Sequence, residues 1–125
     1  MNLNQVTISS LNVEIATAFY KTLGLLLIVD ALPRYVRFEC PDGDATFSIH
    51  KVEKLPTIKS TTLYFEVENL SKTVSELQQK GVIFNSEILE ESWLWHEAHL
   101  NDPDGNPIII YHAGKNRKSP PWRIN

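Results

Sequence analysis

Three titratable side chains, His50, Glu66 and His99, occupy strand-like stretches in which alternation would turn them toward the same side of a sheet. Two imidazoles and one carboxylate can hold a divalent metal, or can act as a base with its orienting partner. The same groups can also form a buried carboxylate–histidine hydrogen bond that satisfies both partners and does no chemistry. The pattern predicts these three as candidate catalytic residues and as a candidate metal set, and it leaves the three interpretations open.

Large and hydrogen-bonding side chains share this predicted face and are candidate contacts for a ligand. Tryptophan and tyrosine rings suit stacking on a planar or apolar molecule, and an arginine suits a carboxylate or phosphate. A dimer interface is the alternative role for the two tryptophans, and an ion pair with a glutamate is the alternative for the arginine. A shift of one residue in the strand register would move His112 to the other face of the sheet. Packing against the rest of the protein is therefore the alternative to a ligand contact for His112. The candidate ligand-binding residues are Gln5, Arg37, Tyr64, Trp93, Trp95, Tyr111 and His112.

These residues need strands to position them, and the clearest strands flank the turn Asp102-Pro103-Asp104-Gly105-Asn106. Proline fixes φ and glycine permits a positive φ, so this segment predicts a hairpin. Alternation before the turn predicts Leu94, His96, Ala98 and Leu100 on the core side. Trp93, Trp95, Glu97, His99 and Asn101 are expected on the opposite side.

The chain reads as two similar halves, each with a strand, a helix and three further strands. In the first half, residues 3–9 alternate, Asn12 is a helix N-cap, and LLLIVD (25–30) is short and apolar enough for a strand buried on both sides. In the second half, Asn69 is the N-cap and GVIF (81–84) is expected to be a short strand. Because CPDGDATFSIH is echoed by DPDGNPIIIYH 62 residues later, we predict modules at about 1–54 and 60–114, followed by an extended tail at 115–125.

Length and composition narrow the class of protein. A chain of 125 residues is about one domain, and its net charge of −3 argues against nucleic acid as a partner. No apolar run approaches a membrane span and the first residues lack the pattern of a signal peptide, so a cytoplasmic location is predicted. The single cysteine, Cys40, excludes an internal disulfide and a cysteine-rich metal site.

The doubled pattern, the segment NVEIATAFYKTLGL and the turn DPDGN resemble the vicinal oxygen chelate superfamily, which includes glyoxalase I, extradiol dioxygenases and bleomycin resistance proteins. The resemblance covers Leu3 to Gly114, and the segments WLWHEAHLNDPDGNPIIIYHAG and PPWRI are similar to a branch of small glyoxalase-like proteins. It implies an α+β fold in which two tandem βαβββ modules form a cupped mixed sheet around a cavity, usually completed by formation of a homodimer.

The resemblance also implies where a metal would sit in metal-using relatives. The four ligand positions fall on Gln5, Ser48, Thr62 and Ile109, of which only Gln5 is a ligand type known in the family. We therefore expect the usual site to be degenerate and the cavity to bind a small organic molecule. The alternative is a lyase, isomerase or dioxygenase-type enzyme. It would use Ni, Zn, Mn or Fe at the displaced set His50, Glu66 and His99, or a metal-free Glu/His acid–base pair.

Overall fold

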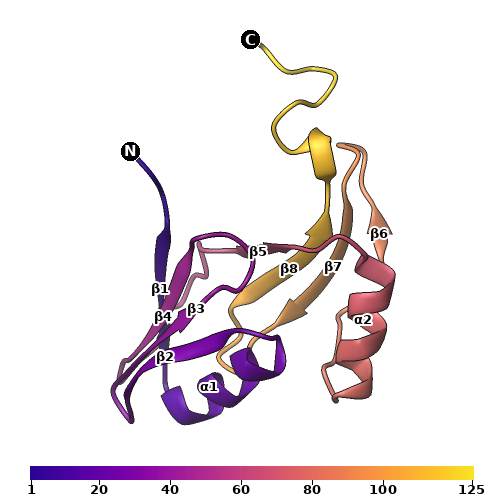
Figure 1. Ribbon diagram of the computed structural model, residues 1–125. Helices are drawn as coiled ribbons and strands as arrows, with labels where there is room; N and C mark the ends of the chain where they lie inside the picture. Colours follow the sequence, from indigo (N-terminus) through magenta and orange to yellow (C-terminus); the bar gives the residue numbers. More distant parts are fainter. The chain divides into compact units, whose positions relative to one another are not determined.

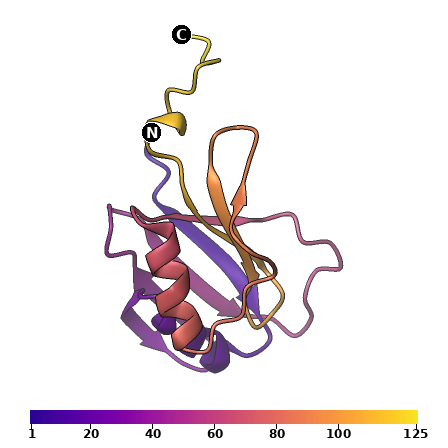
Figure 2. The ribbon, with the colours of Figure 1, turned by 90° about the vertical axis from the view of Figure 1, so that its right-hand side faces the viewer.

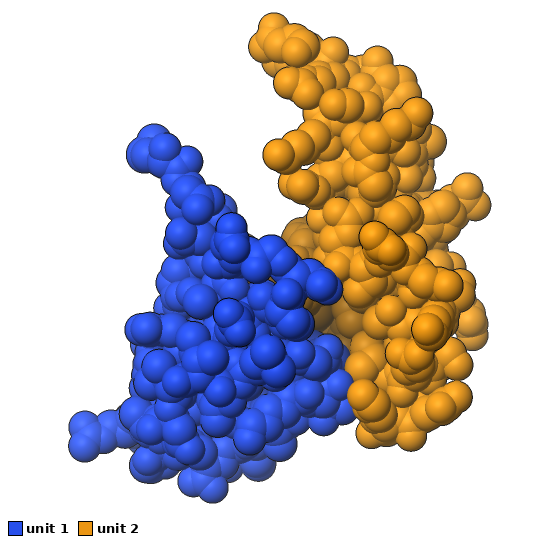
Figure 3. Space-filling model, viewed as in Figure 1, with its two compact units in different colours: residues 1–58, 102–105 blue, residues 59–101, 106–125 orange.

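A computed structural model describes residues 1–125 and divides them into two compact units. The first unit comprises residues 1–58 together with 102–105, and the second comprises 59–101 and 106–125 (Figure 3). Each unit contains one helix and one four-stranded mixed sheet, so the predicted α+β class with two βαβββ modules is confirmed. The predicted cupped cavity concerns the pairing of the modules and stays a prediction.

The first unit is a sheet with strand order β1-β4-β3-β2 and one helix, α1 (Figure 1). β1 runs parallel to β4, and the other neighbours are antiparallel. Its elements are β1 (Gln5–Ser10), α1 (Val13–Thr22), β2 (Leu26–Ala31), β3 (Tyr35–Glu39) and β4 (Thr46–Lys51).

Helix α1 begins at its predicted cap, because the Asn12 side chain accepts a hydrogen bond from the Ile15 N–H at 3.1 Å. The helix buries Val13, Ala16 and Tyr20, and the ring of Tyr20 lies 4.6 Å from that of Phe47, centroid to centroid. These contacts fix α1 against one face of the sheet and leave the opposite face for polar side chains.

The apolar run 25–30 was expected to form a strand buried on both sides, and this expectation is wrong. β2 lies at the edge of its sheet, and Leu26 and Ile28 are half exposed. A shift of register between Leu27 and Val29 also breaks the alternation along this strand. Hydrophobicity alone could not distinguish an edge strand from a central one.

The second unit repeats the arrangement with strand order β5-β8-β7-β6 and helix α2 (Figure 2). β5 and β8 are parallel, and the remaining pairs are antiparallel. Its elements are β5 (Leu63–Glu66), α2 (Leu70–Gln79), β6 (Leu89–Glu90), β7 (His96–Asn101), β8 (Pro107–His112) and the short 3-10 helix η1 (Gly114–Asn116). Asn69 caps α2 as predicted, and Leu70, Val74 and Leu77 are buried.

Two predictions for this unit are wrong. GVIF (81–84) forms no strand, because the N–H groups of Gly81 and Val82 bond to the last carbonyls of α2 and end that helix. Trp93 and Leu94 precede β7 in the loop that follows β6. Leu94 has φ of +70° and is 45% exposed, so it does not join the core.

The turn of the β7–β8 hairpin belongs to the first unit, although both of its strands belong to the second. Tyr20 Oη donates to Asp102 Oδ2 at 2.7 Å, and the Leu11 N–H donates to Asp104 Oδ1 at 2.9 Å. Burial, and then the charge of Asp102, raise the pKa of the Tyr20 hydroxyl. The predicted turn is therefore also an anchor inside the first unit. None of the helices is long and apolar enough to cross a membrane.

Candidate functional site

The face of the first sheet turned away from α1 carries polar side chains in register. Gln5 and Thr7 on β1 lie opposite Thr46 and Ser48 on β4. Gln5 Nε2 donates to Ser48 Oγ at 2.7 Å, the hydroxyls of Thr7 and Ser48 lie 2.7 Å apart, and Thr46 Oγ1 donates to Gln5 Oε1. These groups satisfy one another, so the amide oxygen that Gln5 could offer to a ligand already accepts a hydrogen bond.

Arg37 and His50 lie on this same face and have local partners. Arg37 Nε donates to Tyr35 Oη at 3.0 Å, and its guanidinium lies 5.6 Å from the centroid of the Tyr35 ring. Arg37 therefore packs on a tyrosine and does not form the ion pair that was the alternative to its predicted role as a ligand contact. The Ser48 hydroxyl and the Arg37 cation lower the pKa of the Tyr35 hydroxyl, with desolvation opposing them. His50 Nε2 lies 3.0 Å from Ser9 Oγ.

The face of the second sheet turned away from α2 carries an aromatic cluster of Tyr64, Trp95 and Tyr111. The rings of Trp95 and Tyr111 stack with centroids 4.6 Å apart and planes at 16°, and Tyr64 meets both rings edge-on. Ile109 and Ala113 pack with Tyr111 beside them. Tyr64 remains 52% exposed, so the cluster is open to solvent on one side.

Next to this cluster, Glu97 and His99 lie on β7 with one residue between them, opposite Tyr111 and Ile109 on β8. Glu97 is 2% exposed, and its two carboxylate oxygens have different partners. Oε1 lies 2.8 Å from His99 Nε2, and Oε2 accepts the indole N–H of Trp93 at 2.9 Å. The structure thus forms the carboxylate–histidine pair expected of this face, with Glu97 as the carboxylate.

Glu66 lies on the same face and binds the start of the C-terminal segment. Its Oε2 accepts the N–H groups of Ala113 at 2.7 Å and Gly114 at 2.9 Å, while Oε1 lies 3.5 Å from Arg117 Nε. Trp95 Nε1 also donates to the Asn116 carbonyl at 3.4 Å. Residues 113–117 are therefore held by Glu66 and Trp95, so the predicted extended tail begins as an anchored turn.

The predicted set His50, Glu66 and His99 is divided between the units, since His50 belongs to the first. Within the second unit, Glu66 bonds to backbone N–H groups and His99 bonds to Glu97. The side chain missing from the prediction is Glu91, whose carboxylate lies within 4.8 Å of the ligand atoms of Glu97 and His99. Glu91 lies in a loop without periodicity, so alternation gave no signal for it.

The resemblance places the usual metal ligands at Gln5, Ser48, Thr62 and Ile109. The amide of Gln5 and the hydroxyl of Ser48 are bonded to each other. Ile109 offers no ligand atom and is buried against Tyr111, and Thr62 would add only a weak hydroxyl donor. The degeneracy of the usual metal site stays a prediction.

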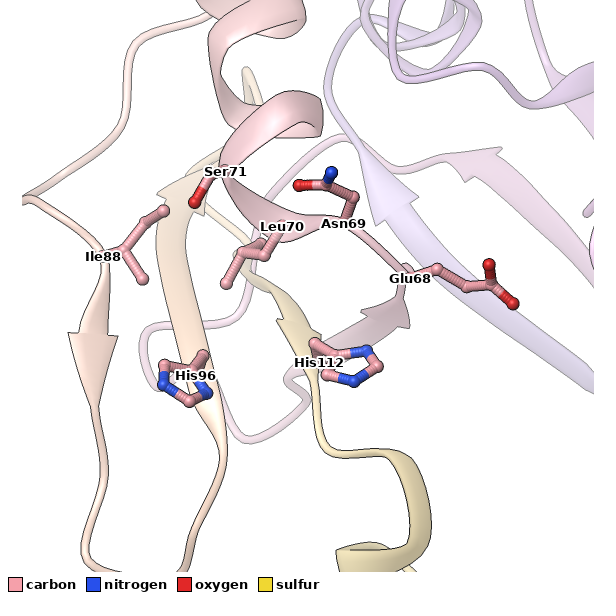
Figure 4. Close-up of a pocket in the computed structure, with 7 residues that line it drawn as sticks. All are labelled: Glu68, Asn69, Leu70, Ser71, Ile88, His96 and His112. Carbon is pink, nitrogen blue, oxygen red and sulfur yellow. The ribbon is translucent and has the colours of Figure 1, made fainter.

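The helix-side face of the second sheet has a shallow cavity of about 250 Å³. His96 and His112 are opposite each other on β7 and β8, and Figure 4 shows both imidazoles below the first turn of α2. His112 Nδ1 donates to the Val67 carbonyl at 2.8 Å, which places this candidate on the side of the helix. The lining residues are Glu68, Asn69, Leu70, Ser71, Ile88, His96 and His112.

Comparison with known families gives one match that spans most of the chain. Residues 2–110 match the model described as the Glyoxalase/Bleomycin resistance protein/Dioxygenase superfamily. A search of curated proteins found no match.

Solved structures share the fold at low sequence identity. A glyoxalase/bleomycin resistance protein/dioxygenase from Nocardioides has a TM-score of 0.79 at 16% identity, covering 100% of this chain and 90% of that one. A lactoylglutathione lyase from Agrobacterium tumefaciens has a TM-score of 0.76 at 12% identity, with coverages of 94% and 96%. A putative glyoxalase family protein from Bacillus anthracis has a TM-score of 0.75 at 21% identity, with coverages of 90% and 95%. At these identities the likeness shows the fold alone.

Proposed function

Since the chain belongs to the glyoxalase/bleomycin resistance protein/dioxygenase superfamily, we propose that it binds a small planar organic molecule on the aromatic cluster of its second unit. The observation that carries this proposal is the stack of Trp95 on Tyr111, with Tyr64 edge-on and half exposed. Aromatic rings that are held in place lose little entropy on binding, and they offer both π-faces and polar tips.

The charges beside the cluster indicate the class of ligand. Glu66 and Glu97 lie opposite Tyr111 in the neighbouring strands, and a cation is in contact only with Glu66, through Arg117. A neutral or cationic ring with hydrogen-bond donors suits this face better than an anion does. The Tyr111 hydroxyl also stays protonated, because burial and the charge of Glu66 raise its pKa.

The test is a screen of planar aromatic compounds by ligand-observed NMR, followed by calorimetry of the hits. Trp95→Leu should weaken the hits tenfold or more, equivalent to about 1.4 kcal/mol, because it removes the stacking ring. Trp122→Leu is the matched control, since Trp122 is an exposed residue of the C-terminal segment. Equal affinity for wild type and Trp95→Leu would remove the aromatic cluster from the binding site.

The second candidate function is a lyase- or isomerase-type enzyme that abstracts a proton next to a carbonyl group, and the Glu97–His99 pair favours it. Because Glu97 accepts the Nε2 proton, Nδ1 of His99 is left to take a proton from a substrate. His99→Gln should then abolish exchange of the substrate's α-proton with deuterated solvent while binding persists. His96→Gln, on the opposite face, is the control.

We also propose roles for the other predicted site residues, which lie on the sheet faces turned away from the helices. Glu66→Gln tests the proposed role of Glu66 as a base, and Arg37→Gln tests the proposed ligand contact of Arg37. His50 and Gln5 keep the catalytic and ligand-binding roles predicted for them. A homodimer in the cytoplasm is likewise proposed, and light scattering after gel filtration measures the oligomeric state.

A further inference from the structure

We propose that the β6–β7 hairpin holds a divalent transition-metal ion on Glu91, Glu97 and His99, at positions that differ from those used by metal-binding relatives. Each residue offers one ligand atom, and these atoms all lie within 4.8 Å of one another. Two carboxylate oxygens and one imidazole nitrogen suit Mn²⁺, Fe²⁺, Co²⁺, Ni²⁺ or Zn²⁺.

Spacing supports the site. His99 Nε2 and Glu97 Oε1 lie 2.8 Å apart. Two ligand atoms at about 2.1 Å from one ion are separated by about 3.0–3.4 Å at octahedral or tetrahedral angles. A small adjustment therefore allows both atoms to bind one cation, which replaces the proton now shared between them.

The hairpin holds the third ligand in place. The Glu91 N–H donates to the Trp95 carbonyl at 2.8 Å, and the Leu94 N–H donates to the Glu91 carbonyl at 3.0 Å. The loop closing this hairpin is visible in Figure 2 between β6 and β7. Both backbone groups of Glu91 are therefore fixed within the turn, and only its side chain must move toward an ion.

The charge of the group supports a cation. Glu97 is almost completely buried, yet neither Glu91 nor Glu97 forms an ion pair with a lysine or arginine. Burial of an uncompensated carboxylate is costly, and His99 can offset only one of the two charges. The Trp93 indole N–H bonds the other oxygen of Glu97 and would orient the carboxylate, as outer partners do for metal ligands.

Titration of the tag-free protein with Co²⁺ tests the proposal, by calorimetry and by visible absorbance. We expect one ion per chain, and at least tenfold weaker binding for Glu91→Gln and for His99→Gln. Glu90→Gln is the matched control, because Glu90 is the neighbouring residue and its carboxylate lies 4.0 Å from His96 instead. Glu91 is partly exposed, so its substitution should leave the fold intact, and circular dichroism verifies this.

Tryptophan fluorescence gives a second readout. Co²⁺ bound beside Trp93 should quench its emission, and Trp93→Phe should lose most of the quenching while it still binds Co²⁺. Absence of binding at millimolar Co²⁺, or wild-type affinity in Glu91→Gln, would overturn the proposal. Trp95→Leu should leave the affinity for Co²⁺ unchanged. The proposal of a metal site and the proposal of ligand binding on the aromatic cluster can therefore be refuted independently of each other.

Discussion

The hydrogen bond between Tyr20 and Asp102 should make the stability of the protein fall at alkaline pH. In the folded protein the pKa of Tyr20 is raised above its ordinary value of 10.0 by burial and by the charge of Asp102. The bond to a carboxylate at 2.7 Å should contribute about 1.5–3 kcal/mol. Tyr20→Phe should therefore lower the free energy of unfolding by about this amount at pH 8.

The sign of the pH dependence follows from where the proton is held. Above pH 10 the unfolded chain loses the Tyr20 proton while the folded protein keeps it, so the free energy of the unfolded state falls relative to that of the folded state and the protein becomes less stable. At pH 11 this removes about 1.4 kcal/mol from the wild type and nothing from Tyr20→Phe. The difference between the two proteins should shrink by that amount between pH 8 and pH 11.

Urea unfolding followed by circular dichroism at both pH values measures this difference. Tyr35→Phe is a control of opposite sign, because the pKa of Tyr35 is lowered and its contribution therefore grows as pH rises toward 10. A Tyr20→Phe difference that stays constant or grows at pH 11 would refute the role assigned to the buried pair.

Two further predictions concern the second unit. Asn69→Ala should cost about 1 kcal/mol of stability, because the side chain of Asn69 accepts the Lys72 N–H at the start of α2, and thermal unfolding measures the loss. Leu100→Ala should cost about 2–5 kcal/mol, whereas Leu94→Ala should cost much less because Leu94 is exposed in the hairpin loop; comparable losses would place Leu94 in the core, where alternation had predicted it.

Much of the second sheet could be predicted from alternation, because side chains on a strand change sides at every residue. The register puts Tyr64, Ile109 and His99 in one row, and Glu66, Tyr111 and Glu97 in the next, on the face that the sequence indicated. The caps at Asn12 and Asn69 could be predicted for the same kind of reason, since each satisfies N–H groups only a few residues away.

The partners on that face could not be predicted, because they depend on contacts across strands and on a loop. Alternation placed Glu66 and Glu97 on the same face as His99, and we predicted Glu66 as its partner. In the structure Glu97 is the partner of His99, and Glu66 instead accepts the N–H groups of Ala113 and Gly114. Glu91 follows a two-residue strand, which is too short to show any period. The sequence likewise gives no sign of the positive φ at Leu94.

The β7–β8 turn belongs to the first unit while its strands belong to the second. This arrangement affects how the chain could be cut into fragments and how it could have evolved. Residues 102–105 belong to the first unit, so the polypeptide passes between the units three times, and no single cut separates them. A fragment ending at residue 58 would carry Tyr20 without its acceptor, Asp102. Two half-length fragments should therefore regain structure only when mixed, and a duplicated ancestral module would have become dependent on its copy once this turn was shared.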